Sequence, residues 1–216
     1  MNLVLHGYWR SSAAYRVRIG LNLKALEYRQ VSHDLRTGEQ HQPAYRARAP
    51  SGLVPMLDAD GVCLTQSLAI LEWLEESYAP PPLLPQGAAP RAVVRAMAAI
   101  VACDIHPLNN LRVLNALRGD LHADQDAVHS WAARWILDGF AALETMVSEH
   151  GGGFCFGDSP TIADCCLIPQ LYNARRFAVE LDAFPALLAV EAKCFALEAF
   201  VKAKPELQPD ADDAGQ

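Results

Sequence analysis

The sequence lacks the short motifs that mark nucleotide, metal or serine-hydrolase chemistry. It contains no G-x-x-x-x-G-K-[ST], G-x-G-x-x-G, H-E-x-x-H or G-x-S-x-G element. The three glycines at 151–153 are followed by no phosphate-binding lysine, so we interpret them as a loop. The six cysteines form no C-x-x-C pair, and this spacing indicates neither a disulfide framework nor a zinc site. Buried thiols in a reducing, cytoplasmic compartment are the simpler interpretation.

Positive charge and long apolar runs are also scarce. Lys plus Arg is 18 against 25 for Asp plus Glu, a formal net charge of -7, which argues against a nucleic-acid partner. Only 4 of the 18 cations are Lys, and the preferred Arg suits bidentate binding of carboxylates. No apolar run approaches the roughly 18 residues that span a bilayer, and the N-terminus does not resemble a signal peptide, so we expect no membrane partner. Hydrophobic residues, at 51%, are numerous enough to bury a core.

Residues 1–79 alternate between strand-like and helix-like pieces. Strand-like apolar segments occupy 3–5, 27–32, 53–57 and 62–64, the last two forming a hairpin around Asp60-Gly61. Helical spacing of apolar residues begins at Ser11 or Ser12 and again at Gln66. The predicted order is β-α-β, a long connection, then β-β-α. This order predicts a small α/β domain over residues 1–79.

Strand signals almost vanish after the proline-rich linker at 79–85. Apolar spacing predicts helices over 90–118, 124–149, 161–178 and 185–200, within an all-helical domain spanning 89–205. Thr161 and Asp164 have the spacing of a capping box. The tail after Pro205 is polar and acidic, and we expect it to be loose.

Three candidate sites lie in the N-terminal region. Ser11 and Ser12 follow the first strand at a helix start, where hydroxyls and free N–H groups stabilise an anion, although, taken alone, the pair is better explained as an ordinary N-cap. Val54 precedes Pro55, and a cis proline there leaves backbone groups of Val54 to pair with a peptide-like ligand. A trans proline at a strand start is the alternative, and the sequence alone does not choose between the two. Gln66-Ser67 opens a helix that could hold a carboxylate.

Two candidates lie in the helical region. In C-D-I-H-P-L-N-N-L-R-V, helical spacing puts His106, Asn109, Asn110 and Val113 on one face of a helix and Asp104 on another. So many polar groups beside Pro107 favour a functional cluster over a solitary structural histidine. Arg175 and Arg176 point about 100° apart on a helix, so we expect at most one of them to face a site.

Together, these segments resemble the zeta-class glutathione transferases, and among them the bacterial maleylacetoacetate and maleylpyruvate isomerases. The resemblance covers nearly the whole chain and rests on W-R-S-S-x-x-Y-R-V-R-I-x-L-N-L-K, L-V-P-x-L, Q-S-L-A-I-L-E-W-L-E-E, C-D-I-H-P-L-N-N-L-R-V-L and G-D-S-P-T-I-A-D. It implies a thioredoxin-like N-terminal domain, an all-α glutathione-transferase C-terminal domain, and a cytoplasmic homodimer that uses glutathione as cofactor. The implied reaction is cis–trans isomerisation of maleylacetoacetate, from tyrosine breakdown, or maleylpyruvate, from gentisate breakdown.

The resemblance also implies roles for individual residues. Ser11 or Ser12 would stabilise the glutathione thiolate, and Val54, before cis-Pro55, would pair with the cysteinyl backbone. The γ-glutamyl carboxylate would be held by Gln66 and Ser67. His106 and Asn110 would contact the tripeptide or substrate, and Asp104 would reach glutathione bound in the partner subunit. Arg10 and Arg176 would bind the carboxylates of a small dicarboxylate-like substrate.

The sequence departs from the usual family motif at one place, and this departure leaves the identity of the substrate undecided. Maleylacetoacetate isomerases of this class usually read S-S-C-S, whereas this chain has Ala13 and Ala14 after the two serines. A mechanism that needs a cysteine of the enzyme is therefore excluded. Two alternatives remain: a zeta-like transferase acting on small α-haloacids, and a non-catalytic glutathione-binding scaffold.

Overall fold

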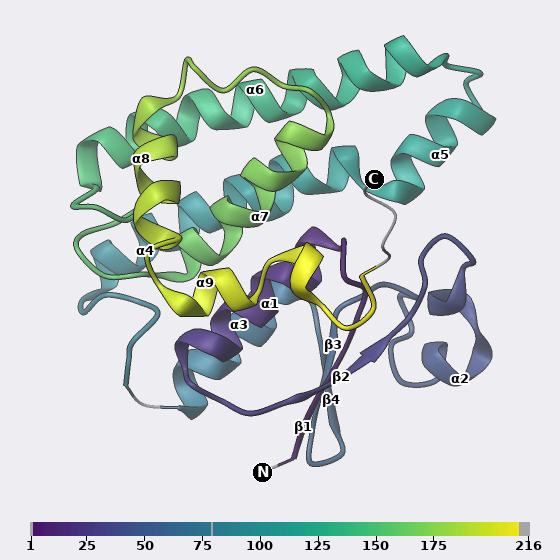
Figure 1. Ribbon diagram of the computed structural model, residues 1–216, viewed down its shortest axis with the longest axis horizontal. Helices are drawn as coiled ribbons and strands as arrows, with labels where there is room; N and C mark the ends of the chain where they lie inside the picture. The colour runs from purple at the N-terminus through teal and green to yellow at the C-terminus, as the bar shows by residue number, and fades with distance from the viewer. Residues whose placement is uncertain (1, 79, 212–216) are drawn as a thin grey trace. The chain divides into compact units, whose positions relative to one another are not determined.

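The computed structural model describes residues 2–78 and 80–211, which form two compact units (Figure 1). One unit contains the described residues up to Leu83 together with those from Phe195 onward. The other is Leu84–Cys194. The predicted fold class, a thioredoxin-like domain followed by an all-helical domain, is confirmed. The domain limits 1–79 and 89–205 stay a prediction, and Ala79 of the predicted linker lies outside the described residues.

A four-stranded sheet forms the centre of the first unit. Its strands are β1 (Leu3–Gly7), β2 (Arg29–Ser32), β3 (Met56–Ala59) and β4 (Val62–Thr65), in the order β2-β1-β3-β4. β1 is parallel to β2 and antiparallel to β3, and β3 is antiparallel to β4. All five residues of β1 are buried, and its apolar start, Leu3-Val4-Leu5, is typical of a central strand.

The predicted hairpin around Asp60-Gly61 is confirmed. Asp60 and Gly61 both have positive φ, 50° and 91°, as a two-residue hairpin turn of this kind requires. β3 begins at Met56 rather than at residue 53, because Pro55 has no N–H to donate to a ladder.

Helices of the first unit cover the sheet on both sides. α1 (Ser12–Leu23) packs against α3 (Ser67–Ser77), while the short helices η1 (Glu39–His41) and α2 (Pro43–Arg46) lie on the other side of the strands (Figure 1). A Cβ at Gly20 would lie 2.4 Å from Cδ2 of Leu71, so glycine is what permits the close approach of α1 and α3.

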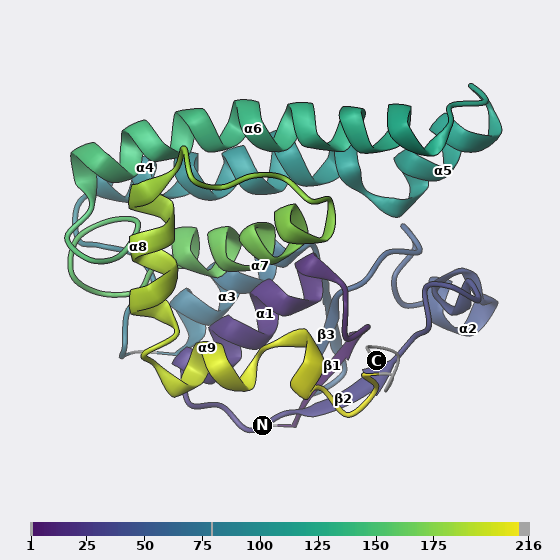
Figure 2. The same ribbon diagram turned by 45° about the horizontal axis from the view of Figure 1, so that its top comes forward.

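The second unit is built from helices, among them α7 (Ile162–Arg176), which packs against α4 (Ala88–Ala99) and α8 (Pro185–Cys194) and is mostly buried (Figure 2). It also contains α5 (Leu111–Gly119) and α6 (Gln125–His150). The predicted capping box is confirmed, since the Thr161 side chain accepts from the helix and Asp164 returns to the Thr161 N–H. Asp164 is fully buried, and burial raises the pKa of its carboxyl. No helix among the described residues is long and apolar enough to cross a membrane.

The prediction of one helix over 90–118 is wrong. After α4 the chain forms a π-helical turn, η2 (Ile100–Ile105), then a 3-10 turn, η3 (His106–Asn109), and α5 begins only at Leu111. Pro107 cannot donate to an α-helical ladder, and Asn110 is extended and caps α5 through its side chain, which accepts from the Arg112 N–H at 3.2 Å. The prediction that one face of a regular helix carries His106, Asn109, Asn110 and Val113 is therefore wrong.

Two predictions about the C-terminal part are also wrong. The helix expected over 185–200 breaks after Cys194, and a separate helix α9 (Glu198–Lys202) packs on α1. The chain between Pro205 and Ala211 is not loose: it forms a short turn, η4 (Pro205–Leu207), and is hydrogen-bonded to Trp9 and to Gln30 of β2. Residues 212–216 of the predicted tail lie outside the described residues.

Candidate functional site

Strand register brings three of the predicted segments to one edge of the sheet. His6 of β1 pairs with Met56 of β3, and Met56 pairs with Thr65 of β4. The chain leaving β1 toward Ser11, the chain entering β3 from Val54, and the chain leaving β4 toward Gln66 therefore meet at this edge. The first unit gathers backbone and hydroxyl groups from three separate stretches of sequence.

Ser11 is the N-cap of α1. Its Oγ accepts the N–H of Ala14 at 3.2 Å, so the hydroxyl proton of Ser11 remains free to donate to a ligand. Ser12 is the first residue of the helix and is buried. The first turn of α1 contains no acidic residue, so its positive dipole end is not neutralised from within the helix. An anion at this turn is stabilised.

The peptide bond between Val54 and Pro55 is cis, as the resemblance implied. Val54 lies outside the β1–β3 and β3–β4 ladders, whose pairing starts at Met56. Tyr45 supports this bend because its hydroxyl donates to the carbonyl oxygen of Leu53 at 2.8 Å. An extended peptide can therefore pair with the backbone of Val54.

Gln66 and Ser67 open α3 in an unusual conformation. Gln66 has φ 68°, a left-handed value that costs energy for a non-glycine residue, and its side chain is exposed. Ser67 is buried, and its Oγ accepts from Nη1 of Arg16 at 3.2 Å. That bond leaves the Ser67 proton to donate, and the guanidinium adds positive charge behind the helix start.

Sequence reasoning missed Arg16. It is 2% exposed and lies on the side of α1 that meets Ser67 of α3. Arg18, which is 1% exposed, is two positions further on and points to a different side of the helix. Two arginines two positions apart within Y-R-V-R-I were the available signal, because arginine is almost never fully buried without partners.

The second unit holds the remaining predicted residues. His106 Nε2 and Asn110 Nδ2 are 3.5 Å apart, so these two side chains lie together although the helix between them is broken. Asp104 is exposed on the π-helical turn, a form of helix that recurs at functional sites. Asn109, by contrast, is buried.

Arg175 and Arg176 both end α7 and are both exposed, and the prediction that at most one of them faces a site stays a prediction. Arg175 forms a bidentate ion pair with Glu191 of α8, with N–O distances of 2.6 and 2.5 Å. Arg176 is the last residue of α7 and is exposed. In the first unit, the Arg10 guanidinium lies 5.2 Å from the Trp9 ring centroid, in the turn that leads to Ser11.

A cluster of titratable groups lies beside the Val54 bend and was not predicted. His6 Nδ1 is 2.9 Å from His33 Nε2, and Arg48, paired with Asp58, donates to His6 Nε2 at 3.2 Å. Burial, together with the neighbouring His33 and Arg48, lowers the pKa of His6 to about 4. No group of three or more His, Cys, Asp or Glu suited to a metal ion occurs among the described residues.

This architecture is that of the glutathione transferases. A family model for the glutathione S-transferase N-terminal domain matches residues 1–76, and one for the C-terminal domain matches residues 114–191. The maleylpyruvate isomerase of a Ralstonia species is 47% identical over 209 residues, which are 96% of this chain and 99% of the relative.

Two similar solved structures indicate which class of glutathione transferase the chain belongs to. A maleylpyruvate isomerase, described as a bacterial glutathione transferase of the zeta class, superimposes with a TM-score of 0.95 at 46% identity, covering 97% of this chain and 100% of the other. A maleylacetoacetate isomerase from Anaeromyxobacter dehalogenans, with glutathione bound in its active site, gives a TM-score of 0.89 at 47% identity and 98% coverage of both chains. The chain belongs to the zeta-class family of maleylacetoacetate and maleylpyruvate isomerases.

Proposed function

We propose that this protein is a glutathione-dependent cis–trans isomerase that converts maleylacetoacetate or maleylpyruvate to the fumaryl isomer. The observation that supports it most is the sheet edge at which Ser11, the Val54 bend and the start of α3 meet. The similarity over almost the full length to isomerases of both kinds agrees with it. Substrates of either kind have the same maleyl double bond and differ in the tail beyond it.

The donors at this edge fit a tripeptide with a thiolate and a carboxylate. When bound, glutathione supplies a thiolate that adds reversibly to the cis double bond and is regenerated. Ser11 donates its hydroxyl proton toward that sulfur, and the α1 N-terminus lowers the pKa of the thiol. Ser67 and Gln66 hold the γ-glutamyl carboxylate, with Arg16 fixing the rotamer of Ser67. Val54 pairs with the cysteinyl backbone.

The substrate carboxylates are assigned to Arg10 and Arg176, since a guanidinium binds a carboxylate in a bidentate way and stabilises negative charge that develops on the conjugated system. His106 and Asn110 contact the tripeptide or substrate. Asp104 is assigned to glutathione of the partner subunit of a cytoplasmic homodimer. Ala13 offers no thiol at the helix start, so none of these roles uses a cysteine of the enzyme.

The test is turnover of maleylacetoacetate and of maleylpyruvate, each with and without glutathione. Fast conversion of one substrate that requires glutathione and returns it unchanged supports the proposal and identifies the substrate. Absence of turnover on both contradicts it.

The haloacid transferase is the second candidate, favoured by the departure at Ala13 from the usual S-S-C-S pattern. It consumes glutathione, so mass spectrometry of the products would detect a glutathione adduct. The scaffold alternative predicts retention on a glutathione-affinity column with neither isomerase turnover nor a glutathione adduct.

A further inference from the structure

The C-terminal segment, residues 203–210, is hydrogen-bonded to strand β2 through the side chain of Gln208. This side chain is buried, and its amide nitrogen donates to the carbonyl oxygens of Lys202 and Lys204 at 2.9 and 2.6 Å. Its amide oxygen accepts from Nε2 of Gln30, in β2, at 2.9 Å. Gln208 therefore fixes the direction of the two residues that follow it.

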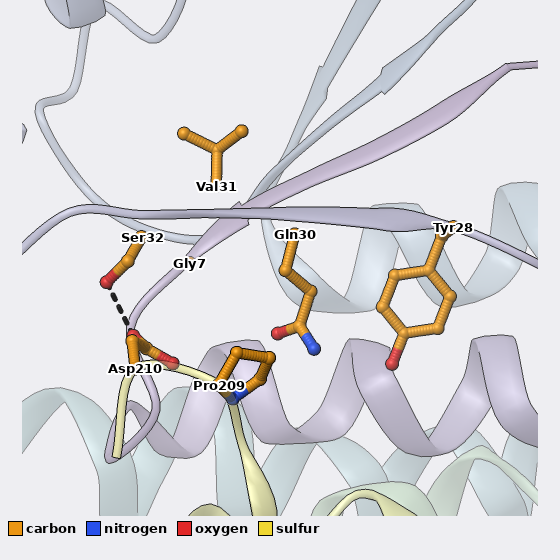
Figure 3. Close-up of a pocket in the computed structure, with 7 residues that line it drawn as sticks. All are labelled: Gly7, Tyr28, Gln30, Val31, Ser32, Pro209 and Asp210. Carbon is orange, nitrogen blue, oxygen red and sulfur yellow. Dashed lines mark hydrogen bonds between the residues drawn. The ribbon is translucent and has the colours of Figure 1, made fainter. Parts of the chain in front are cut away.

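Asp210 contacts the turn that leads to the thiolate-binding serine. One carboxylate oxygen, Oδ2, accepts both the backbone N–H of Trp9 at 3.0 Å and the hydroxyl of Ser32 at 2.5 Å. In Figure 3, Asp210 and Ser32 face each other and Pro209 lies next to Asp210. Together with Gln30, these residues line a cavity of about 290 Å³. The segment thus lies against the end of β2 and over the turn after β1.

The same turn is held from its other side. The carbonyl oxygen of Trp9 accepts from Nη2 of Arg18 at 2.9 Å, and Nε of Arg18 donates to the carbonyl oxygen of Ala203 at 3.1 Å. Both the N–H and the C=O of Trp9 are therefore tied, directly or through Arg18, to residues 203–210. The turn continues through a bond from the Ser11 N–H to the Tyr8 carbonyl oxygen at 3.0 Å.

We propose that residues 203–210 form a C-terminal clamp that sets the position of Arg10 and Ser11, with Asp210 as a positioning residue. The proposal rests on the proposed function, in which Arg10 binds substrate and Ser11 donates to the thiolate. A carboxylate that accepts two hydrogen bonds on one oxygen holds the Trp9 peptide more firmly than solvent does. Small displacements of reacting groups cost large factors in rate, so the clamp acts on turnover from outside the site.

The experiment compares Asp210→Ala, Asp210→Asn and a chain ending at Gln208, with Glu206→Gln as the control. Glu206 is exposed in the same segment, and its substitution removes the same charge without touching Trp9. Asparagine still presents one oxygen in place of Oδ2, so it can keep both hydrogen bonds while losing the charge. The measurements are kcat and KM for the isomerisation, the thermal midpoint, and hydrogen exchange of the Trp9 amide.

We expect Asp210→Ala and the shortened chain to lower kcat/KM about tenfold or more and to speed Trp9 amide exchange by about the same factor. Asp210→Asn keeps the acceptor oxygen but loses the charge that strengthens both bonds, so it should fall between Asp210→Ala and the wild type, and Glu206→Gln should match the wild type. Unchanged amide exchange in Asp210→Ala overturns the clamp, as does faster exchange with unchanged turnover. A loss in Asp210→Asn equal to that in Asp210→Ala also overturns it.

Failure of the two proposals can be told apart. A wild-type protein without isomerase turnover contradicts the proposed function, whereas the exchange of the Trp9 amide then still tests the clamp. Glutathione affinity in the four variants then replaces turnover as the second readout, and affinity unaffected by Asp210→Ala rejects the clamp.

Discussion

Ser11 has one observed role, as the N-cap of α1, and one proposed role, as the donor to the glutathione thiolate, and substitution can separate them. As the N-cap of α1 it accepts from the Ala14 N–H, and in the proposed mechanism it donates its proton to the glutathione thiolate. Ser11→Ala removes both interactions. Ser11→Asp keeps a cap acceptor but places a negative charge beside the thiolate. Ser11→Thr keeps both the cap and the donor.

The N-cap and the hydrogen bond to the thiolate contribute different free energies. Loss of a serine N-cap costs about 1 kcal/mol of unfolding free energy. A hydrogen bond to a charged group contributes about 1.5–3 kcal/mol, which corresponds to one or two pKa units of the bound thiol. We therefore expect Ser11→Ala to lose stability and raise the thiol pKa. Ser11→Asp should keep wild-type stability or exceed it, yet raise the thiol pKa further.

Two measurements read these quantities independently. Urea denaturation gives the unfolding free energy, and ultraviolet absorbance of the thiolate, followed against pH with glutathione bound, gives the thiol pKa. Ser11→Thr is the matched control and should resemble the wild type in both. If the pKa of the bound thiol is the same in wild type, Ser11→Ala and Ser11→Asp, Ser11 is not the donor and Ser12 takes that role.

Three further predictions concern other parts of the molecule. Asp164→Ala should cost about 3 kcal/mol or more in urea denaturation, because it leaves the buried N–H and hydroxyl of Thr161 without their acceptor; a loss under 1 kcal/mol would contradict this. Because the pKa of His6 falls to about 4 on folding, the unfolded chain binds more protons between about pH 4 and 6.5. Stability should therefore rise with pH across that window and level off above it, and His6→Gln should flatten the profile. Arg176→Ala should raise the KM for substrate much more than the Kd for glutathione, whereas Arg175→Ala, which breaks only the pair with Glu191, should change neither; equal losses for both ligands in Arg176→Ala would remove its substrate role.

Local signals accounted for most of the element order. Features that depend on a few adjacent residues could be predicted from the sequence. They are the Asp60-Gly61 turn, the helix caps at Ser11 and Thr161, and the described part of the proline-rich linker. The helix predicted through Pro107 was wrong because apolar spacing continued across it. Spacing records which side chains avoid water but not whether each backbone N–H can reach its acceptor.

For the candidate site too, the sequence predicted individual residues but not how the fold brings them together. Ser11, Val54 and Gln66 could be named from motifs, because helix starts and X-Pro bonds are visible in a single sequence. That they meet at one edge depends on the register of β1, β3 and β4, which no single motif contains. Arg16 was missed because its partner, Ser67, is 51 positions away.

By itself the sequence determined the family, the thioredoxin-like and helical parts, and the residue types that can bind a thiolate and carboxylates. Tertiary packing was needed to show which side chains and peptide groups already have partners: Ser67 is bonded to Arg16, Arg175 to Glu191, and the Trp9 peptide to Asp210. The last of these pairs joins residues 201 positions apart. Such contacts have no periodicity and no fixed spacing, because they arise only after packing brings distant polar groups together where water no longer competes for them.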